Sequence, residues 1–266
     1  MSEYVHGYSD IEASRLCDQA RALQDLLHHD TSYAAGSLVL EAGCGVGAQT
    51  VTLLRNSPGA RLICVDISPD SLVEARRRVS EAGLDGASFQ RADILQLPFE
   101  PGSFDHVFVC FVLEHLADPK GALGYLKTML KEGGTITVIE GDHGSAYFHP
   151  ESEAARRDVE CLVRLQRRSG GNALIGRELY PLLHAVGFKD VRVSPRMVYV
   201  DSSRPELVEY FTRRTFTAMV AGVREEAISS GMISEGDFDK GIEGLNRTAE
   251  EDGTFCYTFF KATAFK

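Results

Sequence analysis

Short apolar segments alternate with stretches of helical periodicity over residues 36–142. The apolar segments begin near residues 38, 61, 89, 103 and 130, and several of them end in a glycine or an acidic residue. Runs of this length and composition predict buried strands of a parallel sheet, joined by helices. The carboxyl ends of such strands meet at one edge of the sheet, where ligands bind in this kind of fold.

The residues on either side of this core are predicted to be mainly helical. Ser9 and Glu12 form a capping box before an apolar stripe, which predicts an N-terminal lid helix. Two helices are expected up to Gly187, which stops the second. A strand follows, and the next strand is delayed by a segment of helical periodicity. We predict a single domain, 1–266, with a lid helix at 1–30, a core at 36–142, helical additions at 143–188 and 203–252, and strands at about 189–200 and 254–265.

The first apolar segment runs directly into a glycine turn. The turn reads Glu41-x-Gly43-x-Gly45-x-Gly47 and leads into a helix expected at 47–56. Only glycine lets the backbone approach a ligand this closely or adopt positive φ without a clash, so a nucleotide-like cofactor is expected here. The spacing of Gly43, Gly45 and Ala48 also fits a dinucleotide fingerprint, which leaves an NAD-linked oxidoreductase as a remote alternative.

Acidic residues follow the next two strands. Asp66 ends the second strand and is placed to accept hydrogen bonds from both hydroxyls of a ribose. Ser68 and Pro69 supply the cap and the first turn of the helix after it. Asp93 follows the third strand, where its carboxylate can accept from an adenine amino group.

These motifs, together with Leu113-Glu114-His115-Leu116 after strand four and Lys131-Glu132-Gly133-Gly134 before strand five, occur in one order and spacing. The series resembles the class I S-adenosylmethionine-dependent methyltransferases, in particular the ubiquinone- and menaquinone-biosynthesis-like branch that acts on small molecules. Glu132 stands where that family usually has proline. The resemblance implies a Rossmann-like, doubly wound α/β fold with a seven-stranded, mostly parallel sheet and an antiparallel last strand. It implies S-adenosyl-L-methionine as cofactor, with candidate contacts at Glu41, Gly43, Gly45, Asp66, Ile67, Asp93, Ile94 and Phe111.

The same resemblance implies methyl transfer to a small-molecule acceptor. An enzyme of this fold can instead cleave or cyclise the cofactor and release methylthioadenosine, which is the main alternative. A protein that binds the cofactor without catalysing a reaction is a further alternative. The Asp93-Ile94 pair and the Leu113–Leu116 motif argue against an NAD enzyme.

A general base is needed only if the acceptor arrives protonated. His115 is the first candidate, since it follows strand four, and His143 is expected in a loop after strand five. Three polar aromatic side chains precede the lid helix, and one of them, Tyr8, is a further catalytic candidate. No metal is expected, because the acids and histidines around His143 match no structural zinc pattern. Arg15 and Gln19 are candidates for the cofactor, and the substrate-pocket candidates are Tyr4, His6, Arg177, Tyr180 and Tyr199.

The excess of acidic over basic residues argues against one class of partner. Acidic residues outnumber basic residues 38 to 28, for a formal charge of −10, so nucleic acid is not an expected partner. The clusters Arg76–Arg78 and Arg164 with Arg167 and Arg168 are interpreted as solvated helix faces. The six cysteines form no C-x-x-C pair, and the start lacks a basic-then-apolar leader, so a cytoplasmic protein without membrane contact is expected. The inserted helices offer a surface for a homodimer.

Overall fold

The computed structural model describes residues 23–266. The chain divides into two compact units. The core unit comprises residues 24–140, 175–195 and 260–266. The helical unit comprises, among the described residues, Leu23, 141–174 and 196–259. The strands β5 (Leu130–His149), β6 (Lys189–Asp201) and β7 (Thr254–Phe265) each contribute residues to both units.

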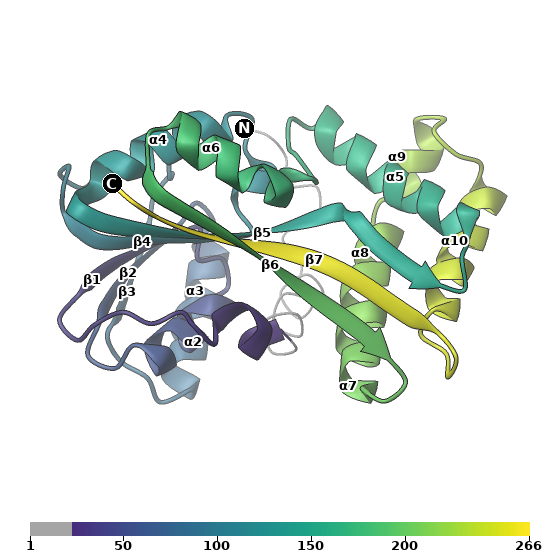
Figure 1. The fold of residues 1–266 in the computed structure, drawn as a ribbon, viewed down its shortest axis with the longest axis horizontal. Coiled ribbons are helices and arrows are strands. Elements are labelled where there is room, and N and C mark those ends of the chain that lie inside the picture. The colour runs from purple at the N-terminus through teal and green to yellow at the C-terminus, as the bar shows by residue number, and fades with distance from the viewer. Residues whose placement is uncertain (1–22) are drawn as a thin grey trace. The chain divides into compact units, whose positions relative to one another are not determined.

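The sheet has seven strands in the order β3-β2-β1-β4-β5-β7-β6 (Figure 1). Its first four members are β1 (Leu38–Ala42), β2 (Arg61–Asp66), β3 (Ala87–Arg91) and β4 (Phe104–Cys110). These strands pair in parallel, and β4 pairs in parallel with β5. The last strand, β7, runs antiparallel to its neighbours, which confirms the predicted Rossmann-like sheet.

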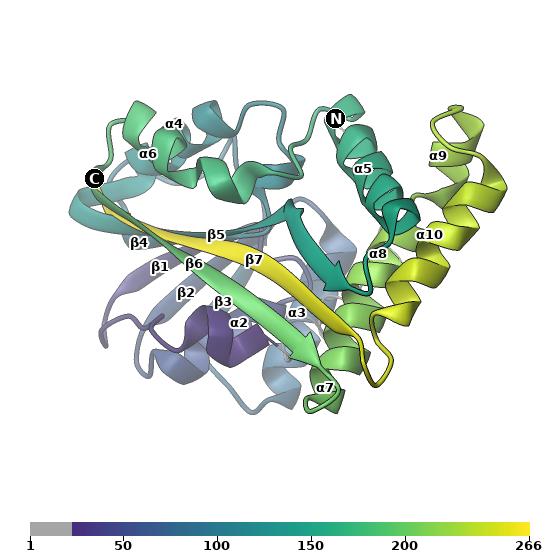
Figure 2. The same ribbon diagram turned by 45° about the vertical axis from the view of Figure 1, so that its right-hand side comes forward.

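Helices cover both faces of the sheet in the core unit. Helices α2 (Ala48–Asn56) and α3 (Pro69–Glu81) lie on one face, and α4 (Pro119–Met129) and α6 (Leu179–Ala185) lie on the other (Figures 1 and 2). Short 3-10 turns, η1 (Leu113–His115) and η2 (Ile175–Glu178), complete the connections. The α4 and α6 side packs through buried aliphatic side chains, among them Leu123, Leu126, Leu179, Leu183, Val107, Val109, Ile136 and Val138.

Local chemistry explains where these helices begin. The Ser68 side chain accepts a hydrogen bond from the Ser71 N–H, and Pro69 occupies the first turn of α3, as predicted. Asp118 caps α4 in the same way by accepting from the Gly121 N–H. Helix α6 ends at Ala185, and Gly187 follows with φ +82°, which confirms the predicted stop.

Strand β5 is much longer than predicted. It continues through Gly141 to His149, so the prediction of a helical addition beginning at residue 143 was wrong for residues 143–149. Glycine, aspartate and serine favour turns over strands, and for this reason the segment read as a loop. Tertiary contacts hold it extended, since the Ser145 hydroxyl accepts from the Thr258 N–H at 2.9 Å.

The helical unit is built from the predicted additions. It contains α5 (Glu153–Arg168), α7 (Pro205–Leu207), a π-helix (Val208–Thr217), α8 (Ala218–Ala221), α9 (Arg224–Ser229) and α10 (Glu235–Arg247). Helices α5 and α10 pack closely (Figure 2). Gly241 and Gly244 of α10 make this approach possible, because a Cβ on either would collide with side-chain oxygens of α5 or its cap.

One of those oxygens belongs to a buried acid. The Asp158 carboxyl is fully buried against Gly241, and among the described residues neither oxygen has a hydrogen-bond partner. Burial raises the pKa of Asp158 to about 7; Arg157 opposes this shift, and Asp237 and Asp239 add to it. The carboxyl is therefore partly neutral near physiological pH.

A π-helix aligns the aromatic core of the helical unit. Phe211 and Phe216 are five residues apart, a spacing that falls on one face in a π-helix and on different faces in an α-helix. Both rings contact the inward side chains of β7. The Phe216 ring lies 4.7 Å from that of Phe255, and Phe211 lies 5.9 Å from both Tyr257 and Phe259.

In residues 23–266, none of the helices has the length and apolar character needed to cross a membrane.

Candidate functional site

The glycine loop leaves the carboxyl end of β1 as a tight turn. Gly43, Gly45 and Gly47 all have positive φ, at +78°, +51° and +76°. The N–H groups of Gly43 and Cys44 both donate to the Val65 carbonyl of β2, at 2.9 Å. The loop is therefore anchored to the neighbouring strand before α2 begins.

Each glycine in the loop meets a different environment. A Cβ on Gly43 would lie 2.5 Å from the Val112 Cγ2, and a Cβ on Gly47 would lie 2.9 Å from the Ala75 Cα. Among the described residues, a Cβ on Gly45 would meet nothing within 4 Å. Gly43 and Gly47 are thus required by protein packing, whereas the backbone at Gly45 faces open space.

Asp66 lies next to that open backbone. Its Oδ2 accepts from the Gly45 N–H at 2.8 Å, and its Oδ1 accepts from the Ser68 N–H at 2.9 Å. Burial raises the pKa of Asp66, and these backbone hydrogen bonds oppose that shift. A carboxylate has about four lone-pair directions, so acceptor capacity remains for a ligand.

The other residues predicted for the cofactor's ribose and adenine lie close by in sequence and sheet order. The Ile67 side chain follows Asp66 and is 43% exposed. Asp66 pairs in register with Arg91 of β3, and Asp93 follows two residues later. Asp93 is exposed and accepts from the Leu95 N–H at 2.9 Å, while Ile94 is buried.

Glu41 points into the protein. Its Oε2 accepts from the Thr50 hydroxyl at 2.7 Å and from the Cys64 thiol at 3.3 Å. Burial raises the pKa of Glu41 to about 7, against the opposing effect of those two hydrogen bonds. Glu41 therefore links β1 to α2 and β2, the elements that flank the glycine loop, and so stabilises the loop.

The turn after β4 contains an unusual backbone. Phe111 has φ +58°, a left-handed conformation that is rare for a bulky residue. The turn leads into η1, which carries His115. The His115 side chain is 20% exposed, and its Nε2 lies 3.7 Å from the Glu114 Oε1. Among the described catalytic candidates, His115 is the one placed in the core unit.

His143 lies in the helical unit and is part of strand β5, which corrects the expected loop position. Its Nδ1 lies 2.7 Å from the Tyr257 hydroxyl, and its ring packs edge-on against Phe216 at 6.5 Å. The side chain is buried within the aromatic core of that unit.

The remaining candidates are dispersed. Arg177 on η2 and Tyr180 on α6 are exposed in the core unit, where Tyr180 stacks on His184 at 6.1 Å. Tyr199 lies on β6 in the helical unit and is also exposed. Five further candidates, Tyr4, His6, Tyr8, Arg15 and Gln19, lie outside the described residues.

Comparisons with known proteins agree with this geometry. A family model described as a methyltransferase domain matches residues 40–138. A demethylmenaquinone methyltransferase of Thermus thermophilus is 37% identical over 102 residues, which cover 38% of this chain and 46% of that protein. Residues 40–138 are therefore a methyltransferase domain of the class I, S-adenosylmethionine-dependent type. The cofactor of this family is S-adenosylmethionine.

Two further similarities extend over more of the chain. An uncharacterized 37.1 kDa protein in transposon TN4556 of Streptomyces fradiae is 32% identical over 77% of this chain and 59% of its own length. The solved structure of the [4+2]-cyclase SpnF has a TM-score of 0.57 at 19% identity, covering 94% of this chain and 80% of that one. At that identity the likeness concerns the fold alone. The chain spans 59%, 35% and 46% of the first three curated relatives' lengths.

The residues present fit the family's cofactor. The open backbone at Gly45 lies beside a partly buried carboxylate, and an exposed apolar side chain follows that carboxylate at Ile67. Such a set suits a ligand that has ribose hydroxyls and a flat apolar ring. In the part of the chain from residue 23 onward, no group of three or more His, Cys, Asp or Glu side chains is arranged to hold a metal ion.

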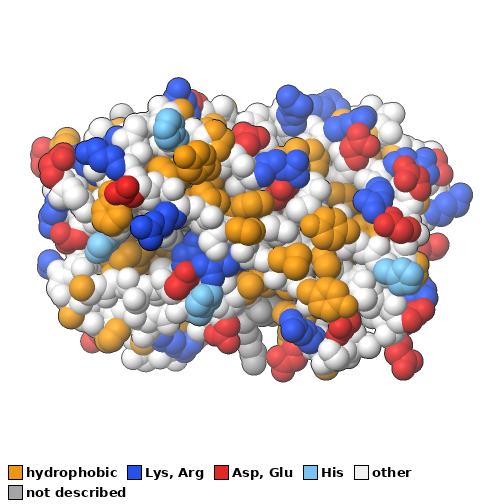
Figure 3. Space-filling model, in the orientation of Figure 1, with side chains coloured by type: hydrophobic (Ala, Val, Ile, Leu, Met, Phe, Trp, Pro, Cys, Tyr) orange, Lys and Arg blue, Asp and Glu red, His pale blue; other side chains and the backbone are white. Residues whose placement is uncertain are grey.

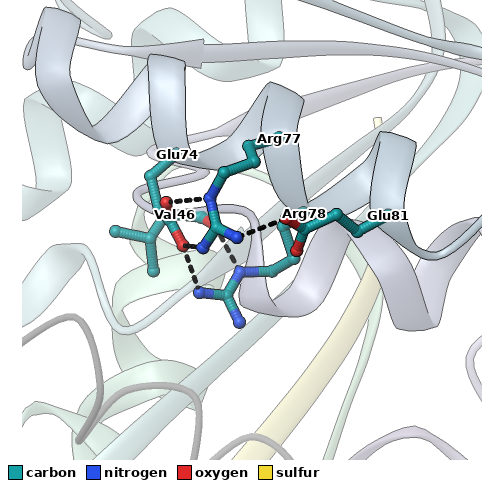
Figure 4. A network of polar contacts seen from close by, with 5 residues as sticks. All are labelled: Val46, Glu74, Arg77, Arg78 and Glu81. Carbon is teal, nitrogen blue, oxygen red and sulfur yellow. Dashed lines mark hydrogen bonds and ion pairs between the residues drawn. The ribbon is translucent and has the colours of Figure 1, made fainter.

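Arg78 of α3 supports the glycine loop, a role that was not predicted from the sequence. Arg78 donates from Nε to the Val46 carbonyl at 3.1 Å and from Nη2 to Glu74 at 2.8 Å (Figure 4). Arg77 pairs with Glu74 and Glu81 on the exposed side of the helix. The interpretation as a solvated helix face therefore holds for Arg77 but was wrong for Arg78. The spacing of Glu74 and Arg78 signals an ion pair, but only the fold reveals the bond to Val46.

Proposed function

We propose that the chain binds S-adenosylmethionine at the glycine loop and transfers its methyl group to a small-molecule acceptor. One observation carries the proposal: Gly45 turns an open backbone toward solvent directly beside the Asp66 carboxylate. The matched methyltransferase family supports the same reading.

The core unit supplies the proposed cofactor contacts. Asp66 would accept from the ribose hydroxyls with the lone pairs that its two backbone bonds leave over. Asp93 would accept from the adenine amino group, since its carboxyl is exposed. Apolar contacts are assigned to Ile67, Ile94 and Phe111, and loop contacts to Glu41, Gly43 and Gly45. Arg15 and Gln19 stay candidates for the cofactor's polar end.

The cofactor supplies an activated methyl group on a sulfonium, so the tasks left to the protein are orientation and exclusion of water. Where the acceptor arrives protonated, we assign its proton to His115, whose ring is partly exposed and whose neighbour Glu114 can stabilise the imidazolium. His143 is a weaker candidate, because its Nδ1 is engaged with the Tyr257 hydroxyl inside an aromatic core. Tyr8 stays a candidate.

The charge distribution favours a small acceptor over a nucleic acid. Arginines of the two basic clusters lie in local ion pairs, such as Arg77 and Arg78 with Glu74, and Arg164 with Glu160. On the face drawn in Figure 3, acidic and basic side chains are interspersed. Phosphate backbones bind to concentrated basic surfaces instead. Acceptor selection is assigned to the segments outside the common core, with Tyr4, His6, Arg177, Tyr180 and Tyr199 as candidate contacts, and a homodimer stays a prediction.

A product assay by mass spectrometry tests the proposal. The protein is incubated with S-adenosylmethionine, with and without a mixed extract of small metabolites. S-adenosylhomocysteine that forms only with the extract would support methyl transfer, and the methylated product identifies the acceptor. Methylthioadenosine formed above the spontaneous rate without extract would instead show that the cofactor is the substrate. A variant with Ala at His115 should lose turnover more than affinity for S-adenosylhomocysteine.

A further inference from the structure

Glu140 ends the part of β5 that belongs to the core unit, and its side chain is fully buried. Its Oε1 accepts two backbone hydrogen bonds from a segment far away in sequence. The Val112 N–H donates at 3.0 Å, and the Leu113 N–H donates at 2.8 Å. One carboxyl oxygen thus satisfies two donors in the turn after β4.

This turn needs external support. Phe111 precedes the two amides and holds the left-handed conformation, with φ +58°. Such a conformation costs about 1–3 kcal/mol for a non-glycine residue and persists only where its surroundings over-determine it. Here the Phe111 N–H donates to the Ile139 carbonyl at 2.9 Å, and Glu140 takes the next two amides. Two adjacent residues in the middle of β5, Ile139 and Glu140, therefore hold all three amides.

The same turn bears on the glycine loop. Val112 lies so close to Gly43 that a Cβ there would come within 2.5 Å of its Cγ2. A displacement of Val112 would remove the wall against which the loop rests. Glu140 thus holds the Val112 backbone in place, and the Val112 side chain in turn supports the glycine loop.

We propose that Glu140 is a positioning residue for cofactor binding, because its Oε1 fixes the Phe111–Leu113 turn that supports the glycine loop. It acts through the turn and is assigned no contact with the cofactor. The inference rests on the proposed binding of S-adenosylmethionine at that loop. Burial, and then the charge of Glu114, raise the pKa of Glu140, and the backbone hydrogen bonds that it accepts oppose this shift. A neutral amide should replace it, while an apolar side chain should not.

The test compares Glu140→Gln, which keeps an oxygen acceptor, with Glu140→Met, which keeps the volume and removes the acceptor. Asp105→Asn is the matched control. Asp105 also accepts from a backbone amide, that of Leu38 at 2.8 Å, but it lies at the amino end of β4. The readouts are the affinity for S-adenosylhomocysteine by calorimetry and hydrogen exchange at the Val112 and Leu113 amides.

Glu140→Met should bind S-adenosylhomocysteine about tenfold to a hundredfold more weakly, with faster exchange at both amides. Glu140→Gln and the control should stay within about threefold of the parent. Parental affinity in Glu140→Met, or an equal loss in Glu140→Gln, would overturn the proposal. If Glu140→Met does not fold, rapid exchange of the two amides in the parent would overturn it. If the parent itself does not bind S-adenosylhomocysteine, the proposed function fails. The exchange data then still test whether Glu140 holds the Val112 and Leu113 amides.

Discussion

Replacing Asp66 with alanine should weaken cofactor binding strongly. The carboxylate accepts from the Gly45 and Ser68 amides, and we assign its remaining lone pairs to the ribose hydroxyls. A hydrogen bond to a charged group contributes about 1.5–3 kcal/mol, which corresponds to a loss of affinity between about tenfold and a hundredfold. Losing the hydrogen bond from the Gly45 N–H adds to this cost, because the glycine loop is then no longer held in place.

Calorimetric titration with S-adenosylhomocysteine measures the effect without knowledge of the acceptor. Asp93→Ala is the comparison, because Asp93 is exposed and holds a single loop amide, that of Leu95. The loss of affinity for S-adenosylhomocysteine should be smaller in Asp93→Ala than in Asp66→Ala. Melting temperatures separate a binding defect from an unfolded protein. An Asp66→Ala protein that is folded and binds as tightly as the parent would refute the assignment of this site.

Three further perturbations test the packing around the site and in the helical unit. Gly47→Ala should lower the free energy of unfolding by about 1–3 kcal/mol in chemical denaturation, because the new Cβ collides with α3 at a residue with φ +76°. Gly124→Ala is the control: it lies at an open helical position and should raise the free energy of unfolding by about 0.5–1 kcal/mol. Asp158 has its pKa raised to about 7, above its unfolded value, so the folded state loses stability as the pH rises from about 4 to about 7. Asp158→Asn should lack this pH dependence. Between about pH 4 and about pH 8, its free energy of unfolding should therefore rise by up to about 4 kcal/mol relative to that of the parent. Urea unfolding that shows the same pH dependence in both proteins would contradict this prediction. Tyr257→Phe removes the bond to His143 and should lower stability by about 1–3 kcal/mol, measured by thermal melting.

The elements around the cofactor site could be predicted because their signals are local. The glycine turn, Asp66 at the end of β2, and the Ser68 cap all lie at the predicted positions. Each depends on backbone conformation or hydrogen bonding within a few residues, which residue type alone largely determines.

Other features depend on distant partners and left no local signal. The second half of β5 contains turn-forming residues, and contacts such as Ser145 with Thr258 hold it extended. The π-helix matches Phe211 and Phe216 to the spacing of β7, which no helical periodicity would indicate. Glu140 reads as an ordinary strand end, although it binds amides 27 and 28 residues away.

The most direct test of the account follows the methyl group itself. The protein is incubated with S-adenosylmethionine that carries a deuterated methyl group, together with a small-metabolite extract, and the products are analysed by mass spectrometry. The account predicts S-adenosylhomocysteine and a small molecule that has gained the labelled methyl group, with both products strongly reduced in Asp66→Ala at a low concentration of the cofactor. Label retained in methylthioadenosine, with no labelled acceptor, would contradict methyl transfer.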